Sequence, residues 1–557
     1  MELRRGGRCY AQSLPPIDDD PSSFLSPDEI QLLSDMVNRR AEARKIGDYG
    51  TADRIRDTME RSIALPPHIV LELEDFPRRQ GGGSSWKLRR KVSGVTDFSL
   101  DGPSVLQLAH IALGLAVHAF EQGLELDLAA LQSLSTKAKD RLGTHLVSQE
   151  LTGRKAADAA FWFALAGVSD SSLLHSLADV CSNEIARFGS RESCRGKDIQ
   201  QMLDRFAAAG LEKHEKLERA AREALAAKGT PCDDGMASSL LNFHSDRCLS
   251  MLWKFSTRQR KQRLFLNEAR SHWEASFDNR SKITVLKPTL TVGAQHDWGT
   301  VYKDPTRPLI VDIGCGMGVS LLGWVKNDSP SGIANSTQCN FAGVDLNSVA
   351  IGYAKGLKKT WNLADRLEFF VEDASIFLSR VMETYPGPVE VCMIQFPTPF
   401  RLIKGEEDFR GNCHLPVSAT DGFMVSKRLL EQCWGALISK GETGVGKLLF
   451  QSNCQDVAVW IRRTACDECC FRCETELEDF VSVENHRAST RKTRPTKRSL
   501  DWIALGGEVA VGPGWSEHPL LPREAWTETE VAYVMEGTPI FRCILEPVDG
   551  ETSANLL

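Results

Sequence analysis

The chain has 557 residues, of which 42% are hydrophobic and 25% are charged, and its formal net charge is -7. This length exceeds what one hydrophobic core organises, so several folded regions are expected, and the composition excludes a largely disordered protein. The longest apolar run, Ile111 to Phe120, is too short to cross a membrane, and the negative charge argues against indiscriminate nucleic-acid binding.

The cysteines and the N-terminus bear on the cellular compartment. The 16 cysteines have no regular spacing, and no apolar secretory segment is present, which favours an intracellular protein. Residues 1–26 are interpreted as an N-terminal tail. Its first part carries Arg4, Arg5 and Arg8 with a single acid, a weak transit-peptide character that leaves cytoplasm, plastid and mitochondrion open.

Residues 27–92 are predicted to form a helical module. Apolar residues recur at helical spacing from Pro27 to Ser62, which predicts two helices joined near Gly47–Gly50. The run Asn38 to Asp57 resembles the small C-terminal helical domain of cysteinyl-tRNA synthetases, and this resemblance implies a surface that contacts tRNA. The alternative is a charged helical hairpin that serves only as a spacer.

Residues 100–230 are rich in Ala and Leu at helical spacing, and the pattern repeats. Gly123, Gly167 and Gly210 recur every 43 or 44 residues, and Leu131, Leu174 and Leu217 follow the same period. This predicts stacked helical hairpins and resembles the degenerate helical repeats of organellar RNA-metabolism proteins, which implies RNA or protein binding. Plain packing of an all-α region explains the same residues. Residues 240–298 are predicted to be a helical linker with a basic face, which either touches phosphate or is simply solvated.

Residues 299–557 carry the pattern of a nucleotide-type site. The segment Leu309 to Gly318 is a short apolar run with Asp312, followed by Gly314, Gly316 and Gly318. Such glycines allow a sharp turn and leave room for a ligand at the start of a helix, expected at Val319 to Val325. Alone, the loop is a weak signal, because glycine-rich turns also bind dinucleotides or simply allow close packing of a strand against a helix.

Two acids after the loop narrow the choice of ligand. Asp345 ends the expected second strand, where a carboxylate accepts hydrogen bonds from both ribose hydroxyls of a nucleotide. Asp373 ends the third strand and is expected near an adenine amino group. The loop and the two acids in this order predict an S-adenosylmethionine (SAM) site on a Rossmann-like α/β sheet, preceded by all-α regions.

Later segments carry a family resemblance. Val389 to Phe400, which includes Gln-Phe-Pro-Thr-Pro-Phe, resembles the fourth strand and loop of tRNA (guanine-N7)-methyltransferases, where the pattern is Asn-Phe-Pro-Asp-Pro-Trp. Gly446 to Trp460 resembles the next strand and helix of that family, and Thr527 to Phe541 its closing Thr-x-x-Glu segment. The similarity spans about residues 300 to 547. It implies methyl transfer from SAM to N7 of guanine in tRNA, at guanosine 46 in the family.

The resemblance assigns roles to individual residues. The expected cofactor residues are Asp312, Gly314, Gly316, Gly318, Asp345, Asp373 and Gln395. The expected substrate residues are Thr527, Glu530, Arg401 and Lys404, and the expected catalytic residues are Thr398, Glu530 and Asn453. The chain departs from the family at three charged substrate-side positions, which are neutral here: Thr398, Leu402 and Asn453.

Two further segments of residues 299–557 are rich in basic residues and in cysteine, respectively. The insertion at 480–500 includes Arg487 to Arg498, with six basic residues and no acid, and is interpreted as a phosphate-binding loop, an import signal or a solvated loop. Cys466, Cys469, Cys470 and Cys473 have Cys-x-x-Cys spacing, but adjacent cysteines suit tetrahedral zinc poorly, so no metal is expected.

Two functions follow as hypotheses. The first is a SAM-dependent tRNA (guanine-N7)-methyltransferase whose N-terminal helices extend tRNA binding. The second is an RNA-binding helical-repeat assembly factor whose SAM-binding domain is catalytically weak, supported by the three neutral positions. Methylation of a protein or small molecule is disfavoured by the family motifs.

Overall fold

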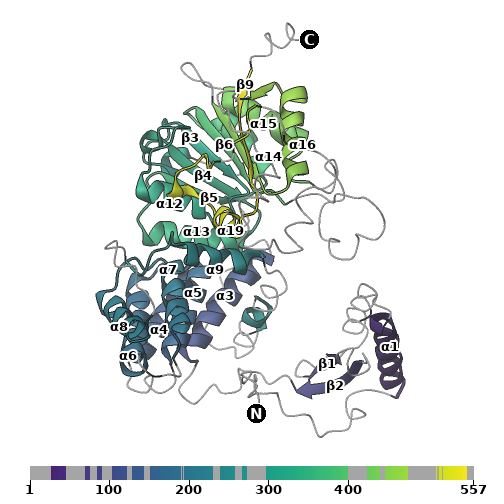
Figure 1. Cartoon of the computed structure of the whole chain (residues 1–557), viewed down its shortest axis with the longest axis vertical. Coiled ribbons are helices and arrows are strands. Elements are labelled where there is room, and N and C mark those ends of the chain that lie inside the picture. Colours follow the sequence, from purple (N-terminus) through teal and green to yellow (C-terminus); the bar gives the residue numbers. More distant parts are fainter. Residues whose placement is uncertain are drawn as a thin grey trace. The chain divides into compact units, whose positions relative to one another are not determined.

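The structure of the chain is a computed structural model. Its contacts divide the chain into two compact units, one containing α1, β1 and β2 and the other containing the elements from α3 onward (Figure 1). The described residues are 27–45, 55, 69–75, 84–90, 103–121, 128–143, 151–189, 191, 194–229, 239–257, 266–271, 297–398, 423–438, 446–473, 510, 513–516 and 518–548.

The first unit contains one helix and two strands among its described residues. Helix α1 (Pro27–Lys45) buries Leu33, Met36 and Val37, whose spacing puts them on one helix face. Strands β1 (Ile69–Asp75) and β2 (Ser84–Arg90) pair antiparallel. The expectation of a helical module up to residue 92 is therefore wrong in its second half. The alternation of Leu and Glu in 71–74 has the two-residue period of a strand. The second helix expected before residue 62 lies outside the described residues apart from Ile55.

The second unit begins with three helical hairpins at the positions of the sequence repeat. They are α3 (Val105–Glu121) with α4 (Leu128–Gly143), α5 (Gly153–Leu165) with α6 (Ser171–Phe188), and α7 (Gly196–Ala208) with α8 (Glu215–Ala226). Gly167 and Gly210 have φ of 81° and 88° just after α5 and α7, a left-handed conformation that ends a helix. Helices α3, α5 and α7 stack in one row and α4, α6 and α8 in another.

Helix α9 (Asp246–Thr257) continues the first row and begins the segment expected to be a basic linker. It buries Cys248, Leu249 and Leu252, and it packs against α7 and against α19 (Glu528–Glu536) near the end of the chain. The described part of this segment therefore packs the hairpins against α19. Most of the basic residues that suggested a phosphate-binding face, from Arg258 to Arg263, lie outside the described residues.

The C-terminal half forms a seven-stranded sheet of order β5-β4-β3-β6-β7-β9-β8. Five neighbouring strands are parallel, and β9 runs antiparallel to both of its neighbours. This order gives the Rossmann-like α/β sheet that the sequence predicts. The strands are β3 (Leu309–Ile313), β4 (Asn340–Asp345), β5 (Leu367–Val371), β6 (Val389–Gln395), β7 (Lys447–Ser452), β8 (Phe471–Cys473) and β9 (Phe541–Pro547).

Helices cover both faces of the sheet. Alternate strand residues contribute to two hydrophobic clusters, one shared with α14 (Ala374–Thr384), α15 (Lys427–Ile438) and α16 (Gln455–Glu468). The other cluster contains side chains from the opposite face of the sheet, from α12 (Val319–Asn327) and α13 (Ser348–Thr360), and from the helical hairpins. The chain order reverses at β3, so a crevice is expected at the C-terminal ends of β3, β4 and β6.

The hairpins and the sheet domain share one hydrophobic core, although the sequence predicted domain boundaries between them, near residues 230 and 299. The buried Tyr353 hydroxyl on α13 donates to the Ala208 carbonyl oxygen at 2.6 Å. Trp361 Nε1 donates to the Gly210 carbonyl oxygen at 3.1 Å. Gly356 on α13 lies directly against the backbone of Gly167. The positive-φ glycines that end α5 and α7 therefore also form the contact surface for α13.

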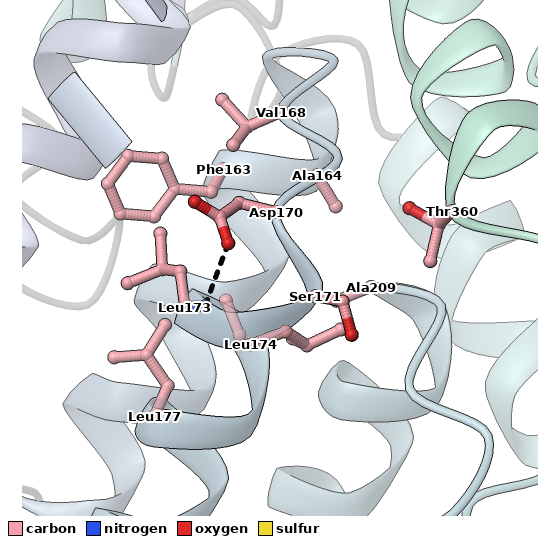
Figure 2. Close-up of a pocket in the computed structure, with 11 residues that line it drawn as sticks. Phe163, Ala164, Val168, Asp170, Ser171, Leu173, Leu174, Leu177, Ala209 and Thr360 are labelled. Carbon is pink, nitrogen blue, oxygen red and sulfur yellow. Dashed lines mark hydrogen bonds between the residues drawn. The ribbon is translucent and has the colours of Figure 1, made fainter. Parts of the chain in front are cut away.

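A small pocket lies beside this contact, between α5, α6 and Thr360 of α13 (Figure 2). Its lining is mostly alanine and leucine. Its one acid, Asp170, caps α6 by accepting from Leu173 N–H at 3.1 Å and from the Ser135 hydroxyl at 2.5 Å. Because the acid is engaged in helix capping, the pocket is a packing gap of the hairpins.

Across the described ranges, no helix is both long and apolar enough to cross a membrane. The same part of the chain contains no group of three or more His, Cys, Asp or Glu side chains arranged to hold a metal ion.

Candidate cofactor and acceptor site

The glycine loop follows β3 and begins the crevice. Gly314, Gly316 and Gly318 have φ values of 74°, 55° and 68°, a left-handed region that disfavours side chains other than hydrogen. A Cβ on Gly318 would lie 2.5 Å from the Phe369 ring, so this glycine is required for packing. Around Gly316, by contrast, no atom comes within 4 Å of the added carbon. The loop is thus tightly packed against Phe369 at Gly318, and it has open space beside Gly316.

Asp345 ties the second strand to this loop. Its Oδ2 accepts from Gly316 N–H at 2.9 Å and its Oδ1 from Asn347 N–H at 2.8 Å. Each carboxylate oxygen has two lone pairs, so each can accept a further bond from a ligand hydroxyl. The predicted ribose acid therefore lies at the glycine loop, as its sequence position required.

Asp373 begins α14 and is exposed. Its Oδ1 accepts from the N–H groups of Ser375 and Ile376, which satisfies two of the unpaired donors at the helix start. From the sequence, we expected this acid near the adenine amino group. In the structure it has a capping role through one oxygen, and only the other oxygen is left for a ligand.

Exposed apolar side chains adjoin these acids and were not recognised in the sequence. Leu346, directly after Asp345, is 65% exposed, and Ile376, three residues after Asp373, is 60% exposed. Met424 lies over the loop, with its sulfur and methyl group 3.4 Å from where a Gly314 Cβ would be. Each of the two acids thus has an exposed large apolar side chain close to it in sequence, which favours a binding surface at these strand ends. In the sequence, these residues could have been found from their positions shortly after the acids at the strand ends.

Two acids beside the loop have raised pKa values. Burial raises the pKa of Asp312 to about 7; the hydrogen bond from Gln395 opposes this shift, and the charges of Asp345 and Glu528 add to it. Desolvation at the start of α19, and then the charge of Asp345, raise the pKa of Glu528 to about 6. A positively charged ligand at the loop would favour the ionised forms of Asp312 and Glu528, so this group of acids suits a cation.

A buried polar row crosses the sheet behind this loop. Gln395, Gln451 and Arg542 are direct cross-strand partners on β6, β7 and β9. Gln395 Nε2 donates to Asp312 Oδ1 at 3.2 Å and to Ser320 Oγ at 3.3 Å, and its Oε1 accepts from Gln451 Nε2 at 2.8 Å. Both amide atoms of Gln395 are thus engaged within the protein, so its expected contact with the cofactor is indirect, through Asp312.

Glu530 belongs to the same row. Its Oε1 accepts from Arg542 Nη2 at 2.8 Å and Nε at 3.2 Å, and its Oε2 accepts from Gln451 Nε2 at 3.1 Å. Only 1% of its surface is exposed. Thr527 caps α19 by accepting from Glu530 N–H at 3.0 Å. The geometry therefore corrects the expectation that Glu530 presents a carboxylate to the substrate, because that carboxylate is buried and paired within the protein. The Thr527 oxygen caps α19, and its O–H can still donate to a ligand.

The remaining substrate-side residues lie at neighbouring strand ends. Thr398 is exposed after β6, and Asn453 is buried after β7. Between β6 and Thr398, Phe396 has φ of 51°, an uncommon strain for an aromatic residue, and its N–H donates to the Gln451 carbonyl oxygen at 2.7 Å. Arg401, Leu402, Lys404 and the basic insertion lie outside the described residues.

The cysteine segment joins α16 to β8. Cys473 Sγ lies 3.4 Å from Cys543 Sγ on the neighbouring strand β9. Cys466 lies on α16, and Cys470 occupies the turn with φ of 56°. These thiols pack at the edge of the sheet, away from the glycine loop.

Similarity to known proteins covers only part of the chain. No protein family profile matches it. A tRNA (guanine-N(7)-)-methyltransferase of Thermosynechococcus vestitus is 28% identical over 104 residues, which is 19% of this chain and 44% of the relative. An enzyme with the same name from Synechococcus elongatus is 28% identical over 105 residues, 19% of this chain and 45% of the relative. The chain thus spans less than half the length of the curated relatives that it matches.

Solved structures resemble the chain weakly. The StiE O-MT domain is 11% identical with a TM-score of 0.23 and covers 55% of this chain and 84% of that one. Geranyl diphosphate C-methyltransferase of Streptomyces coelicolor is 10% identical with a TM-score of 0.22 and covers 44% of this chain and 70% of that one. TM-scores this low carry no argument, and the fold stands on the strand order.

Proposed function

We propose that the chain is a SAM-dependent methyltransferase that acts on N7 of a guanine in tRNA. One observation supports the binding of SAM. Three left-handed glycines follow β3 at the switch point, and Gly316, which donates its N–H to Asp345, has open space beside it. The partial likeness to two cyanobacterial tRNA (guanine-N(7)-)-methyltransferases supports the acceptor half.

The residues present fit SAM. Asp345 would accept the ribose hydroxyls through its remaining lone pairs, and Leu346 and Ile376 would flank a purine. SAM carries a net positive charge, which would favour the ionised forms of Asp312 and Glu528 beside the loop. When bound, SAM supplies an electrophilic methyl group.

Methyl transfer to guanine requires orientation of the base more than it requires proton transfer. N7 of guanine has an in-plane lone pair, so the reaction depends on holding that atom in line with the methyl group. Thr398 and Asn453, at the ends of β6 and β7, keep hydrogen-bonding groups on the side where the family has acids. We propose that these two residues orient the base and that tRNA is the macromolecular partner.

A second function is favoured by the position of Glu530. Because Arg542 and Gln451 occupy its carboxylate, the acceptor side has lost both its family acids and the free use of this one. This supports the alternative of an RNA-binding helical-repeat protein whose SAM-binding domain turns over slowly or not at all.

Incubation of the purified full chain with labelled SAM and undermethylated tRNA tests both functions. Borohydride and aniline cleavage then maps any N7-methylguanosine. The enzyme hypothesis expects label at one guanosine, abolished by Asp345→Asn. Measurable SAM binding without label in tRNA would favour the binding-protein alternative. Label in added protein or small molecules, and none in tRNA, would contradict both.

A further inference from the structure

Two acids of the closing segment, Glu528 and Glu530, have different surroundings. They are the first and third residues of α19, two positions apart on a helix that turns about 100° per residue. Their side chains therefore leave the helix on nearly opposite sides, and only one of them can point toward the buried row of β7 and β9.

Glu530 points toward that row. It is paired with Arg542, at 2.8 Å between Nη2 and Oε1, and both side chains are at most 3% exposed. Buried ion pairs of this kind are expensive to break, because the partner left behind has no solvent to compensate its charge. A ligand would have to displace Arg542 or Gln451 to use this carboxylate.

Glu528 leaves α19 on the other side, at the end of the helix that adjoins the glycine loop. The Ala525 carbonyl oxygen, three residues before Glu528, accepts from Ser320 Oγ, two residues after Gly318. The Glu528 side chain is partly exposed, and its charge acts on Asp312, Cys315 and Asp345, which all belong to the loop or to the strands beside it. Tyr353 on α13 is the other titratable group that it influences. Glu528 therefore lies on the cofactor side of α19, with no cation among these neighbours.

The orientation of α19 is fixed from several directions. Thr527 caps its first turn, and the Ala525 carbonyl oxygen just before it accepts from Ser320 Oγ on α12 at 2.6 Å. Tyr533, near its end, meets Trp253 of α9 edge-on, with ring centroids 6.0 Å apart. Figure 1 shows α19, in yellow, where the sheet domain meets α9. A rotation that exchanged the two glutamates would break each of these contacts.

We propose that Glu528, rather than Glu530, is the ligand-facing carboxylate of this segment and that it contacts the cationic sulfonium end of the methyl donor. Glu530 is a positioning residue that Arg542 and Gln451 hold in the sheet. This inference rests on the proposed function for the identity of the cofactor, but it does not depend on the methyl acceptor.

Calorimetric titration with SAM and with S-adenosylhomocysteine tests the assignment, because the two ligands differ in the charge on sulfur. Glu528→Gln is expected to weaken SAM roughly tenfold and S-adenosylhomocysteine less than threefold, since the lost interaction is with the sulfonium charge. Glu528→Asp should restore part of the preference for SAM. Glu536→Gln, at the other end of α19, is the matched control and should change neither affinity.

Glu530→Gln completes the test. In folded protein it should leave the ratio of the two affinities as in the wild type. The proposal is overturned if Glu528→Gln weakens both ligands equally or neither, if Glu536→Gln has the same effect, or if Glu530→Gln alone removes the preference for SAM. Wild-type protein that binds neither ligand would defeat this inference together with the cofactor assignment. SAM binding without methylation of tRNA would defeat only the proposed acceptor.

Discussion

Arg542 on β9 and Glu530 on α19 form a buried ion pair at the end of a polar row that begins at Asp312. The two glutamines between them, Gln395 and Gln451, use their amide groups to connect four neighbouring strands. Every member of the row is at most 7% exposed. The acid beneath the glycine loop and the acid on α19 are therefore held by one network, which fixes the two sides of the site relative to each other.

Arg542→Met is expected to lower the free energy of unfolding by about 3–5 kcal/mol, because Glu530 would remain buried without its cation. The urea midpoint, followed by tryptophan fluorescence, measures this change. Replacing both residues, Arg542→Met with Glu530→Met, should recover part of the loss, because an apolar pair leaves no buried charge.

Arg472→Met is the matched control for this pair. Arg472 on β8 pairs with Glu546 on β9 at 2.9 Å, but its side chain is 66% exposed. Removing a pair that is this open to water should cost less than about 1 kcal/mol. Equal losses for the two arginine variants would contradict the structural role given to Arg542.

The glycine loop predicts a separation between folding and ligand binding. Gly318→Ala should destabilise the fold strongly, since the new Cβ would lie 2.5 Å from Phe369 and 2.9 Å from Ala354. Gly316→Ala should cost only about 1–2 kcal/mol of backbone strain, because its surroundings are open. It should nevertheless abolish SAM binding by filling that space. Circular dichroism with SAM titration checks both, and a Gly316→Ala protein with wild-type affinity would remove the loop from the site.

The central sheet could be predicted from sequence because its strands are buried on both faces. Leu309–Ile313 and Val389–Gln395 are nearly continuous apolar runs, which is the pattern of parallel strands covered by helices. The strand β8 could not be found in this way. It has three residues and lies at the sheet edge, and from the sequence its cysteine was considered only as a possible metal ligand.

The partners of the site residues were the part that sequence could not supply. The Thr-x-x-Glu pattern locates Glu530 but says nothing of Arg542, whose contact depends on how β9 inserts beside β7. Likewise, the glycine period predicts hairpins, but it does not reveal that Gly167 receives Gly356 of another region. Both relationships are long-range contacts between segments with no shared local pattern.

The two glycines of α13 provide a test of the contact between the hairpins and the sheet domain. Gly356→Ala should lower the thermal unfolding midpoint, because its Cβ would lie 3.1 Å from the Gly167 backbone, which cannot easily yield. Gly352→Ala, one turn earlier, meets no atom within 4 Å and should raise stability by about 0.5–1 kcal/mol through helix propensity. Opposite shifts in calorimetry would agree with the contact, whereas two increases would mean that the hairpins do not press on α13 there.

The acids around the loop predict how stability without ligand depends on pH. The pKa values of Asp312 and Glu528, about 7 and about 6, lie above their ordinary values, so between about pH 4 and 7 the folded chain binds more protons than the unfolded chain. Their contribution to stability is therefore fully present below pH 4 and is lost as pH rises through 6 and 7. The acids whose charges interact are Asp312, Asp345 and Glu528, and the charge of Glu528 also acts on Cys315 and Tyr353.

Comparison of wild type with Glu528→Gln isolates this effect from other titrating groups. Between pH 5 and 8 the thermal midpoint of the variant should fall less than that of the wild type, because one of the mutually repelling acids is gone. SAM affinity should show the opposite trend, rising with pH in the wild type as the carboxylates ionise and rising less in the variant. Parallel pH profiles for the two proteins, in both stability and affinity, would mean that Glu528 does not share the loop with Asp312 and Asp345.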